Sequence, residues 1–324
     1  MTTPVIEAHG LTREFVRRTK ERGRLRSRST LRAVDGLDLT ITAGESVGYI
    51  GANGAGKSTT IKMLVGILVP TAGSVRTCGL DPLRERKELA RHVGVVFGQR
   101  SQLWWDLPTG ESFEILGAIH RLTPRELAAR REELVARLEL GDLLTTPVRQ
   151  LSLGQRMRAE VAAALLHRPR LVILDEPTIG LDVLSKQRLR EFLIGERREH
   201  GTTLLLTTHD MGDIERLCDR VLVVDHGHLV HDGTLGELSA ASGAERVLVV
   251  DATGPTADLL GIPGTRHAGS EADGMRQRLA LTGGEAGLPA VLAEVFGRTD
   301  VRDVSIEEPD IEDVVRRIYL ARGR

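Results

Sequence analysis

The sequence holds 324 residues, of which 45 are acidic and 44 basic, and its formal net charge is −1. This balance provides no basic field for binding nucleic acid, and no apolar run approaches the roughly 20 residues of a membrane-spanning helix. The length predicts about two domains. Residues 1–7 show no charged and apolar export signal. Cys78 and Cys218 lack metal-ligand spacing, so we expect two reduced thiols in a cytosolic protein.

The first 50 residues alternate short apolar runs with turns, which predicts an antiparallel β edge. Within them, residues 17–32 carry eight basic side chains and one acidic side chain, Glu21. A basic loop of this kind could contact anionic lipid headgroups. It could equally be a solvated insertion, as unpaired charge runs usually are. Both interpretations stay open.

A phosphate-binding loop is the most specific signal in the chain. Residues 51–58 match the full pattern G-x-x-x-x-G-K-[ST], between a predicted strand at 47–50 and a predicted helix at 59–68. The glycines let successive N–H groups face the β- and γ-phosphates of a nucleotide, and the helix N-terminus adds partial positive charge. We expect Lys57 on the phosphate oxygens and the Ser58 hydroxyl on Mg²⁺. The predicted nucleotide-binding residues of this loop are Gly51, Ala52, Asn53, Gly54, Ala55, Gly56, Lys57, Ser58 and Thr59.

After the loop, helical stretches alternate with aliphatic strands at 93–97, 171–174 and 203–206. Continuous aliphatic runs are typical of strands that helices cover on both faces. Residues 111–145 are wholly helical in pattern. They predict a helical subdomain, at about 100–160, inserted into an α/β core.

Polar residues follow these strands, at the edge where open α/β sheets bind ligands. Asp175 and Glu176 end one strand, and Gln99 and His209 follow the other two. We expect Asp175 beside Mg²⁺, Gln99 on Mg²⁺ or its water, and Glu176 as the group that orients or deprotonates an attacking water. Carboxylate pairs also occur in ordinary turns, and a lone histidine is usually structural. The phosphate loop upstream favours the functional interpretation of the carboxylates.

Residues 151–155, Leu-Ser-Leu-Gly-Gln, precede a helical run at 156–167. Ser152 is a favourable N-cap residue, and a capped helix alone would account for it. A serine and a glycine at a helix N-terminus also form an anion site. A second interpretation therefore places Ser152 and Gly154 on a phosphate.

Together these motifs resemble the nucleotide-binding subunit of an ABC transporter over about residues 5–237. The resemblance implies an α/β fold, a P-loop ABC-type nucleotide-binding domain with an inserted helical subdomain and an antiparallel β edge. The signature motif departs from the usual L-S-G-G-Q at Leu153 but keeps Ser152 and Gly154. The resemblance assigns Walker A to 51–58, the Q-loop to Gln99, the signature to 151–155 with Ser152, Gly154 and Gln155, Walker B to 171–176, the D-loop to 180–182 with Asp182, the switch histidine to His209, and the aromatic residue that stacks on adenine to Phe15.

The resemblance also implies a function, an ATPase that uses ATP and Mg²⁺ to drive a membrane exporter. Two copies would pair head to tail, so that Ser152 and Gly154 of one chain close on the ATP at Lys57 of the other. His209 would contact the γ-phosphate. The segment 97–108 and the L-S-L-G-Q signature are similar to sodium-extrusion ATPases, which work with separate ABC-2-type permeases, mostly exporters. The permease would hold this cytoplasmic chain on the inner face of the cell membrane.

Two other functions stay open at this point. One is an importer subunit whose C-terminal domain senses substrate. The other is a soluble ABC ATPase acting on ribosomes or DNA, although such members usually carry tandem cassettes or long coiled coils, and the sequence has neither. Trp104 and Trp105 either belong to the core or face a partner, because adjacent residues on a regular element point in different directions.

The composition changes after a predicted hairpin at 220–230, whose turn is Asp-His-Gly-His, and residues 239–243 read as a linker. An alternating pattern then predicts a small α+β accessory domain at 239–324, following a nucleotide-binding domain at 1–238. The acidic residues 307–310 fit dipole stabilisation of the last helix rather than a metal site. The predicted strands of this part are 246–251, 277–281 and 301–306, and the predicted helices are 289–296 and 311–320.

Overall fold

The computed structural model describes residues 3–19, 27–98, 101–208, 210–241, 245–282 and 287–307. Gln99, His209 and the predicted helix at 311–320 lie outside these ranges. The chain divides into two compact units, Met1–Leu235 and Gly236–Arg324. In the described ranges, no helix is both long enough and apolar enough to cross a membrane.

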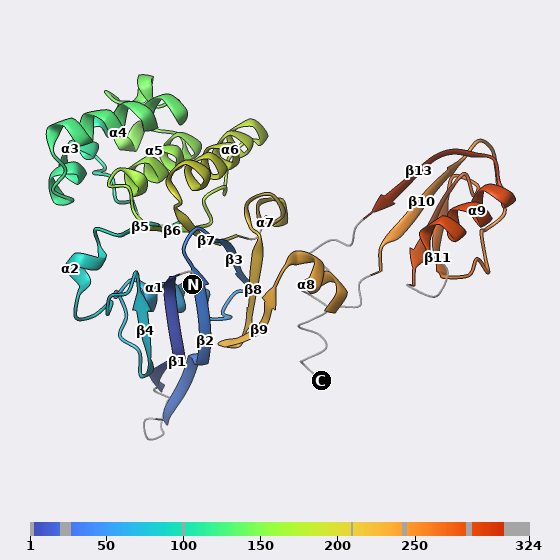
Figure 1. Ribbon diagram of the computed structural model, residues 1–324, viewed down its shortest axis with the longest axis horizontal. Helices are drawn as coiled ribbons and strands as arrows, with labels where there is room; N and C mark the ends of the chain where they lie inside the picture. Colours follow the sequence, from blue (N-terminus) through green and yellow to red (C-terminus); the bar gives the residue numbers. More distant parts are fainter. Residues whose placement is uncertain are drawn as a thin grey trace. The chain divides into compact units, whose positions relative to one another are not determined.

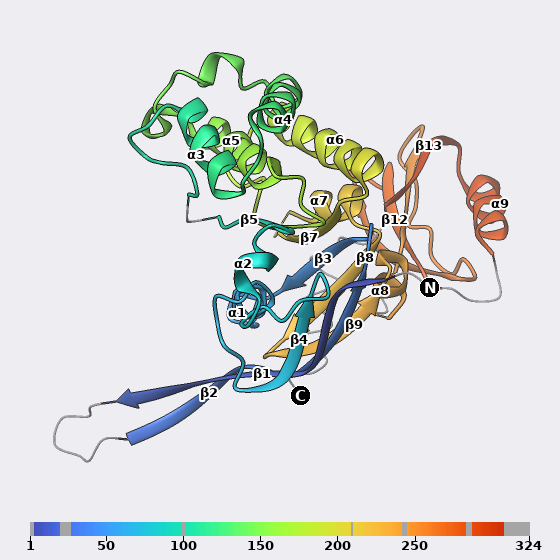
Figure 2. The ribbon, with the colours of Figure 1, turned by 60° about the vertical axis from the view of Figure 1, so that its left-hand side comes forward.

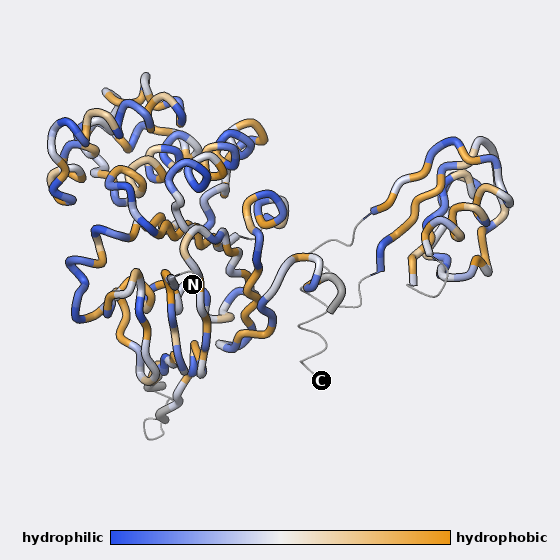
Figure 3. Tube along the Cα trace, in the orientation of Figure 1, coloured by the Kyte–Doolittle hydropathy of each residue, from blue (hydrophilic) through white to orange (hydrophobic). Residues whose placement is uncertain are grey.

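A six-stranded sheet forms the centre of the first unit, in the order β5-β6-β7-β3-β8-β9 (Figure 1). Its first five strands are parallel, and β9 pairs antiparallel with β8. Hydrophobic residues gather along these strands (Figure 3), and β7 is buried over its whole length. The predicted aliphatic strands are confirmed, since burial on both faces removes the alternation of polar residues. The strands are β3 (Ser46–Gly51), β5 (Val93–Val96), β6 (Leu171–Asp175), β7 (Thr203–Thr207), β8 (Arg220–Asp225) and β9 (His228–Gly233).

Strands β8 and β9 form the predicted hairpin. Its turn residues His226 and Gly227 have φ values of 46° and 84°, the two positive values of a type I′ turn. A β-carbon at Gly227 would lie 3.0 Å from the carbonyl oxygen of Ala33. The Gly227 N–H donates to the Ala55 carbonyl at 3.0 Å, and its own carbonyl accepts from Asp35 N at 3.0 Å. Through these two hydrogen bonds, the turn connects the phosphate loop to β2.

The predicted antiparallel edge is a three-stranded sheet in the order β2-β1-β4. It consists of β1 (Pro4–Thr19), β2 (Ser27–Thr42) and β4 (Ala72–Thr77). Strands β1 and β2 stay paired out to Thr19 and Ser27, and they form a long hairpin that projects from the sheet (Figure 2). Parts of the basic run at 17–32 are therefore strand, whereas its residues 20–26 lie outside the described ranges.

Helix α1 (Lys57–Leu64) follows the phosphate loop as predicted but ends before residue 68. Val65 closes it by donating to the Ile61 carbonyl at 3.1 Å. Gly66 then has φ of 71°, and a β-carbon there would lie 2.0 Å from the carbonyl oxygen of Pro82. The chain leaves the helix at this close backbone contact, which the apolar pattern of the sequence does not reveal.

The predicted helical subdomain contains α3 (Thr109–Ile119), α4 (Pro124–Arg137) and α5 (Leu153–Leu165), which lie together in Figure 1. A capping box between Thr123 and Glu126 starts α4, with proline in its first turn. Two 3₁₀ turns, Gly141–Leu143 and Val148–Gln150, break the helical pattern. The same unit contains α2 (Arg86–Leu89), α6 (Val183–His200) and α7 (Met211–Leu217).

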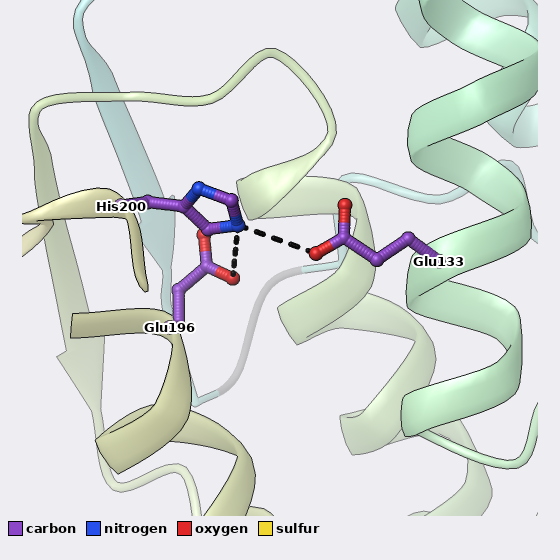
Figure 4. A group of neighbouring side chains, drawn as sticks. All are labelled: Glu133, Glu196 and His200. Carbon is purple, nitrogen blue, oxygen red and sulfur yellow. Dashed lines mark hydrogen bonds and ion pairs between the residues drawn. The ribbon is translucent and has the colours of Figure 1, made fainter. Parts of the chain in front are cut away.

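A buried ion-pair network joins α4 to α6. Arg130 is 1% exposed, and its guanidinium lies 2.8 Å from Glu133 and 2.5 Å from Glu196. His200 Nε2 lies 3.2 Å from Glu133 (Figure 4). Burial raises the pKa of Glu133, but the hydrogen bonds from Arg130 and His200 outweigh it and lower that pKa to about 2. Glu133, Glu196 and His200 converge closely enough for a metal ion, but the Arg130 guanidinium already bonds to both carboxylates, so we assign the network a structural role.

We expect Arg130→Met to lower the free energy of unfolding by about 3–5 kcal/mol, because it leaves the carboxylate of Glu196 buried without its cation. Arg131→Met is the matched control on the same helix. Its ion pair with Glu114 is partly exposed to solvent, so its loss should cost less than about 1 kcal/mol. Urea-induced unfolding of both variants measures the difference. Equal effects would show that the buried network does not stabilise the contact between α4 and α6.

The predicted linker at 239–243 is wrong in its first part, because α8 (Leu235–Ala241) runs through it. Leu238 is fully buried and lies three residues after Leu235, the spacing of one helix face. The serine and alanine residues read as linker composition in the sequence, whereas the buried leucine orders the segment. Residues 242 and 243 lie outside the described ranges.

In its described residues, the second unit contains a four-stranded antiparallel sheet in the order β11-β12-β10-β13 and the helix α9 (Leu288–Arg298). Leu248, Leu279 and Val295 are fully buried in its core. The three predicted strands are confirmed as β10 (Val247–Ala252), β12 (Arg276–Leu281) and β13 (Val301–Glu307). Strand β11 (Thr265–Glu271) is absent from the prediction. It is a polar edge strand that buries little and therefore carries no aliphatic signal.

Candidate active site

The phosphate loop connects β3 to α1 through two glycines in the left-handed region. Gly54 and Gly56 have φ values of 88° and 105°, which favour glycine. A β-carbon at Gly56 would lie 2.3 Å from the carbonyl oxygen of Ala33, and one at Gly51 would lie 2.5 Å from that of Val224. Gly56 is the N-cap residue of α1 and has no side chain to cap the helix. The first N–H groups of the helix are therefore available to an anion.

Lys57, the first residue of α1, folds back over the loop. Its Nζ donates to the carbonyl oxygens of Gly51 and Ala52, the latter at 3.2 Å. Burial lowers the pKa of Lys57, and the negative charges of Glu176 and Asp175 oppose that shift. Both carboxylates thus lie near enough to act on the lysine. These electrostatic effects place the predicted Lys57, Asp175 and Glu176 in the same region of the unit.

Asp175 and Glu176 lie at the end of β6, where hydrogen bonds to the end of the adjacent strand β7 hold them. Asp175 pairs with Thr207 in the sheet register, and its Oδ1 accepts from Thr207 Oγ1 at 2.5 Å. Glu176 N donates to the Thr207 carbonyl at 2.9 Å. Glu176 has φ of 56°, a left-handed conformation that is uncommon for a residue with a side chain and that clusters at functional sites. Sequence reasoning misses Thr207, although its place at the end of a parallel strand puts it at the ligand-binding edge.

A second polar group fixes the loop that follows Glu176. Asp213 of α7 is fully buried and accepts hydrogen bonds from Thr178, from Thr208 at 3.4 Å and from Arg190 at 2.6 Å. One carboxylate therefore joins the loop after β6, the end of β7 and helix α6. The sequence gives no sign of this role, because Asp213 and Arg190 look like ordinary surface residues of helices.

The signature residues lie at the N-terminus of α5. Ser152 Oγ accepts from Gln155 N at 3.2 Å, and Gln155 Oε1 accepts from Ser152 N at 2.9 Å. This is a capping box, so the simpler interpretation of a capped helix holds. Gly154 faces the loop before α6, where a β-carbon would lie 3.1 Å from Leu181 Cδ2.

The predicted site residues form two groups in this chain. Asp182, beside the signature, caps α6 by accepting from Ser185 N at 2.9 Å. Helix α5 lies with α3 and α4 above β5 in Figures 1 and 2, whereas α1 lies below that strand. The signature and the phosphate loop therefore occupy different parts of the unit. Phe15 lies on β1, with the Arg13 guanidinium 4.8 Å from its ring centroid.

The donors beside the phosphate loop fit Mg²⁺ chemically. The Ser58 hydroxyl and the Asp175 carboxylate are hard oxygen donors, the kind that this ion takes. Asp175 and Glu176 both act electrostatically on Lys57, so both carboxylates lie near the phosphate loop. A hydrated Mg²⁺ that also contacts nucleotide phosphates needs only one or two such protein ligands.

Comparison with known proteins decides the family. Residues 34–179 match the family model of the ABC transporter. The chain is 38% identical over 222 residues to the daunorubicin resistance ATP-binding protein DrrA3 of Streptomyces coeruleorubidus, covering 68% of this chain and 69% of that protein. The chain belongs to the ABC transporter family. It is also 34% identical over 218 residues to the ABC transporter ATP-binding protein NatA of Bacillus subtilis, covering 67% and 88% of the two chains.

Two further matches agree with membership of the ABC family. A Nod factor export ATP-binding protein I of Ralstonia nicotianae is 34% identical over 241 residues, covering 73% of this chain and 69% of that protein. A solved dimeric ATP-binding cassette in a post-hydrolysis state, bound to ADP and Pi, gives a TM-score of 0.62 at 26% identity, covering 71% and 98%. The predicted ABC fold and the transport-coupled ATPase are confirmed. ABC ATPases of this kind dimerise and work with permease partners.

Proposed function

We propose that this ABC ATPase drives export through a separate ABC-2-type permease. One relative is named for Nod factor export and another for daunorubicin resistance, and both names support an exporter. In this proposal the permease holds the chain on the inner face of the cell membrane. Residues 1–238 form the nucleotide-binding domain, and residues 239–324 form an accessory domain.

Two observations carry the hydrolytic part of the proposal. Lys57 bonds to the phosphate loop, and the end of β7 holds Asp175 and Glu176, whose charges act on Lys57. The loop N–H groups and Lys57 hold the β- and γ-phosphates of ATP. Ser58, Asp175 and Gln99 would hold Mg²⁺, which would neutralise phosphate charge when bound. A water oxygen attacks the γ-phosphorus, the bond from that phosphorus to the bridging oxygen breaks, and Glu176 accepts a proton from the water. The products are ADP and inorganic phosphate.

A second copy of the chain completes each ATP site in this proposal. The signature lies apart from the phosphate loop within one chain (Figure 1), and a related cassette is dimeric in its solved structure. Ser152 and Gly154 of one protomer, with their helix N-terminus, would close on the γ-phosphate of the ATP held at Lys57 of its partner. Phe15 would stack on the adenine, and His209 would contact the γ-phosphate.

We expect Glu176→Gln to keep nucleotide binding but to lower the hydrolysis rate by roughly 10²–10⁴-fold, because the amide cannot accept the proton. The variant should also accumulate as an ATP-bound dimer, which size-exclusion chromatography with ATP and Mg²⁺ detects. Glu191→Gln, an exposed glutamate on α6, is the control and should hydrolyse ATP normally. Hydrolysis by Glu176→Gln close to the unaltered rate would rule out the proposed base.

Mixing two inactive variants tests the head-to-tail arrangement. A dimer of one Lys57→Ala chain and one Gly154→Asp chain keeps one intact composite site, because both changes fall on the same ATP. Each homodimer has no intact site. We therefore expect the mixture to regain part of the ATPase activity, measured by phosphate release. If heterodimers form and no activity returns, the two halves of the site do not come from different chains.

A cavity beside the signature offers a place for the permease. It measures about 220 Å³, and Phe97, Trp105, Leu153 and Arg156 are among the residues that line it. Trp105 is 53% exposed, and the Arg156 guanidinium lies 5.7 Å from its ring centroid. A half-exposed tryptophan next to a cavity is typical of an anchor for a partner rather than of a core residue. We place a cytoplasmic helix of the permease here.

Changing Trp104 and Trp105 together to alanine should leave ATP binding by the isolated subunit nearly intact but abolish stable assembly with the permease. Truncating an aromatic hot spot commonly costs on the order of 2 kcal/mol or more of binding free energy. Co-purification of the tagged subunit with its permease measures assembly. Phe296→Ala, which truncates an exposed aromatic residue of the second unit, is the control. Retained co-purification, or an unfolded subunit, would contradict the proposed contact.

A further inference from the structure

The third signature residue packs against the loop that leads from Glu176 to α6. A β-carbon at Gly180 would lie 2.2 Å from Leu153 Cδ2, so the leucine side chain occupies the space beside a glycine whose φ is 71°. The next signature residue, Gly154, faces Leu181 in the same way. Leu181 is 8% exposed. Two consecutive signature residues therefore rest on two consecutive residues of the loop.

The chain from Glu176 to Leu181 is a hydrogen-bonded turn. Ile179 N donates to the Glu176 carbonyl at 3.3 Å, and Leu181 N donates to the Thr178 carbonyl at 3.2 Å. The Thr178 hydroxyl donates a hydrogen bond to the buried carboxylate of Asp213 on α7. A displacement at Gly180 therefore reaches Glu176 through hydrogen-bonded peptide units rather than through a flexible connection.

We propose that Leu153 is a positioning residue that holds Glu176 of its own chain in place for hydrolysis. The inference rests on the proposed function, in which the signature of a chain closes on the ATP of its partner while Glu176 of that chain serves its own ATP. The contact between Leu153 and Gly180 joins these two elements within one protomer. Leu153 thereby helps to set the position of Glu176 at the ATP held by Lys57 of the same chain.

The size of the leucine side chain is what makes this link. A glycine at position 153, as in the usual L-S-G-G-Q, would remove every contact of the side chain with Gly180 and leave the turn unsupported on that side. Methionine has nearly the same volume and would keep the contact. A larger residue at position 180 could not replace the lost contact, because the φ of 71° at Gly180 favours glycine.

A heterodimer with one live site separates this role from a direct contact with ATP. One full-length chain carries no inactivating change, and the other carries Lys57→Ala. Two different affinity tags isolate the mixed dimer. The live site then uses Lys57 and Glu176 of the first chain and the signature of the second. Leu153→Gly is placed either in the first chain or in the second. Single-site hydrolysis is measured as a function of ATP concentration.

Positioning predicts a loss when Leu153→Gly is in the first chain, although the signature of that chain faces no bound ATP. We expect kcat to fall about 10- to 100-fold, because small misplacements of a catalytic group have effects of this size. KM for ATP should stay unchanged, because ground-state binding is not altered. Leu153→Met in the same place should restore kcat. Val183→Ala, which truncates an 80% exposed neighbour, should have no effect.

The possible outcomes of this experiment can be told apart. A loss confined to Leu153→Gly in the second chain would show a direct contact with ATP and overturn the positioning role, as would no loss in either chain. A loss in the first chain that Leu153→Met does not restore would also overturn it. If the parent heterodimer has no activity, the composite site of the proposed function fails instead. Thermal unfolding of each variant confirms that the measured dimers are folded.

Discussion

The parallel pairing of β6 with β7 is the constraint on which the site depends. It places Asp175 opposite Thr207, and the side chains of this pair bond to each other. A slip of one residue would turn Asp175 to the other face of the sheet. Both strands are buried by aliphatic side chains, so packing fixes the register. The same pairing supplies the carbonyl that holds Glu176 N, and Glu176 can then adopt its left-handed conformation.

Helix α6 gives the loop after Glu176 a fixed base, because two buried ion pairs anchor it. Near its C-terminus, Glu196 bonds to Arg130 of α4, and nearer its start Arg190 bonds to Asp213 of α7. Both carboxylates are fully buried, and a buried carboxylate without its arginine would be strongly destabilising. The two ion pairs therefore hold α6 in place, and Asp213 also bonds to Thr178 of the loop.

The features that could be predicted from the sequence are those set by residues close together in the chain. A phosphate loop needs its glycines and Lys57 at fixed spacing, and a buried strand needs an aliphatic run, so both could be read from the sequence. Thr207 and Asp213 could not, because they acquire their roles only when distant strands and helices meet. The early end of α1 at Gly66 depends on a contact with another segment. The polar edge strand β11 and the burial of Leu238, just before the predicted linker, likewise depend on neighbouring elements.

Leu153 also lines the cavity beside Trp105, so one side chain touches both the proposed permease site and the turn at Gly180. The capping box of Ser152 holds the first turn of α5 in place, and Leu153 is the first residue of that turn. Coupling between sites needs a contiguous chain of packed groups with more than one arrangement. From the cavity to Glu176, that chain consists of a leucine, a glycine in the left-handed region and a hydrogen-bonded turn. A glycine at position 153 would remove the first link of that chain.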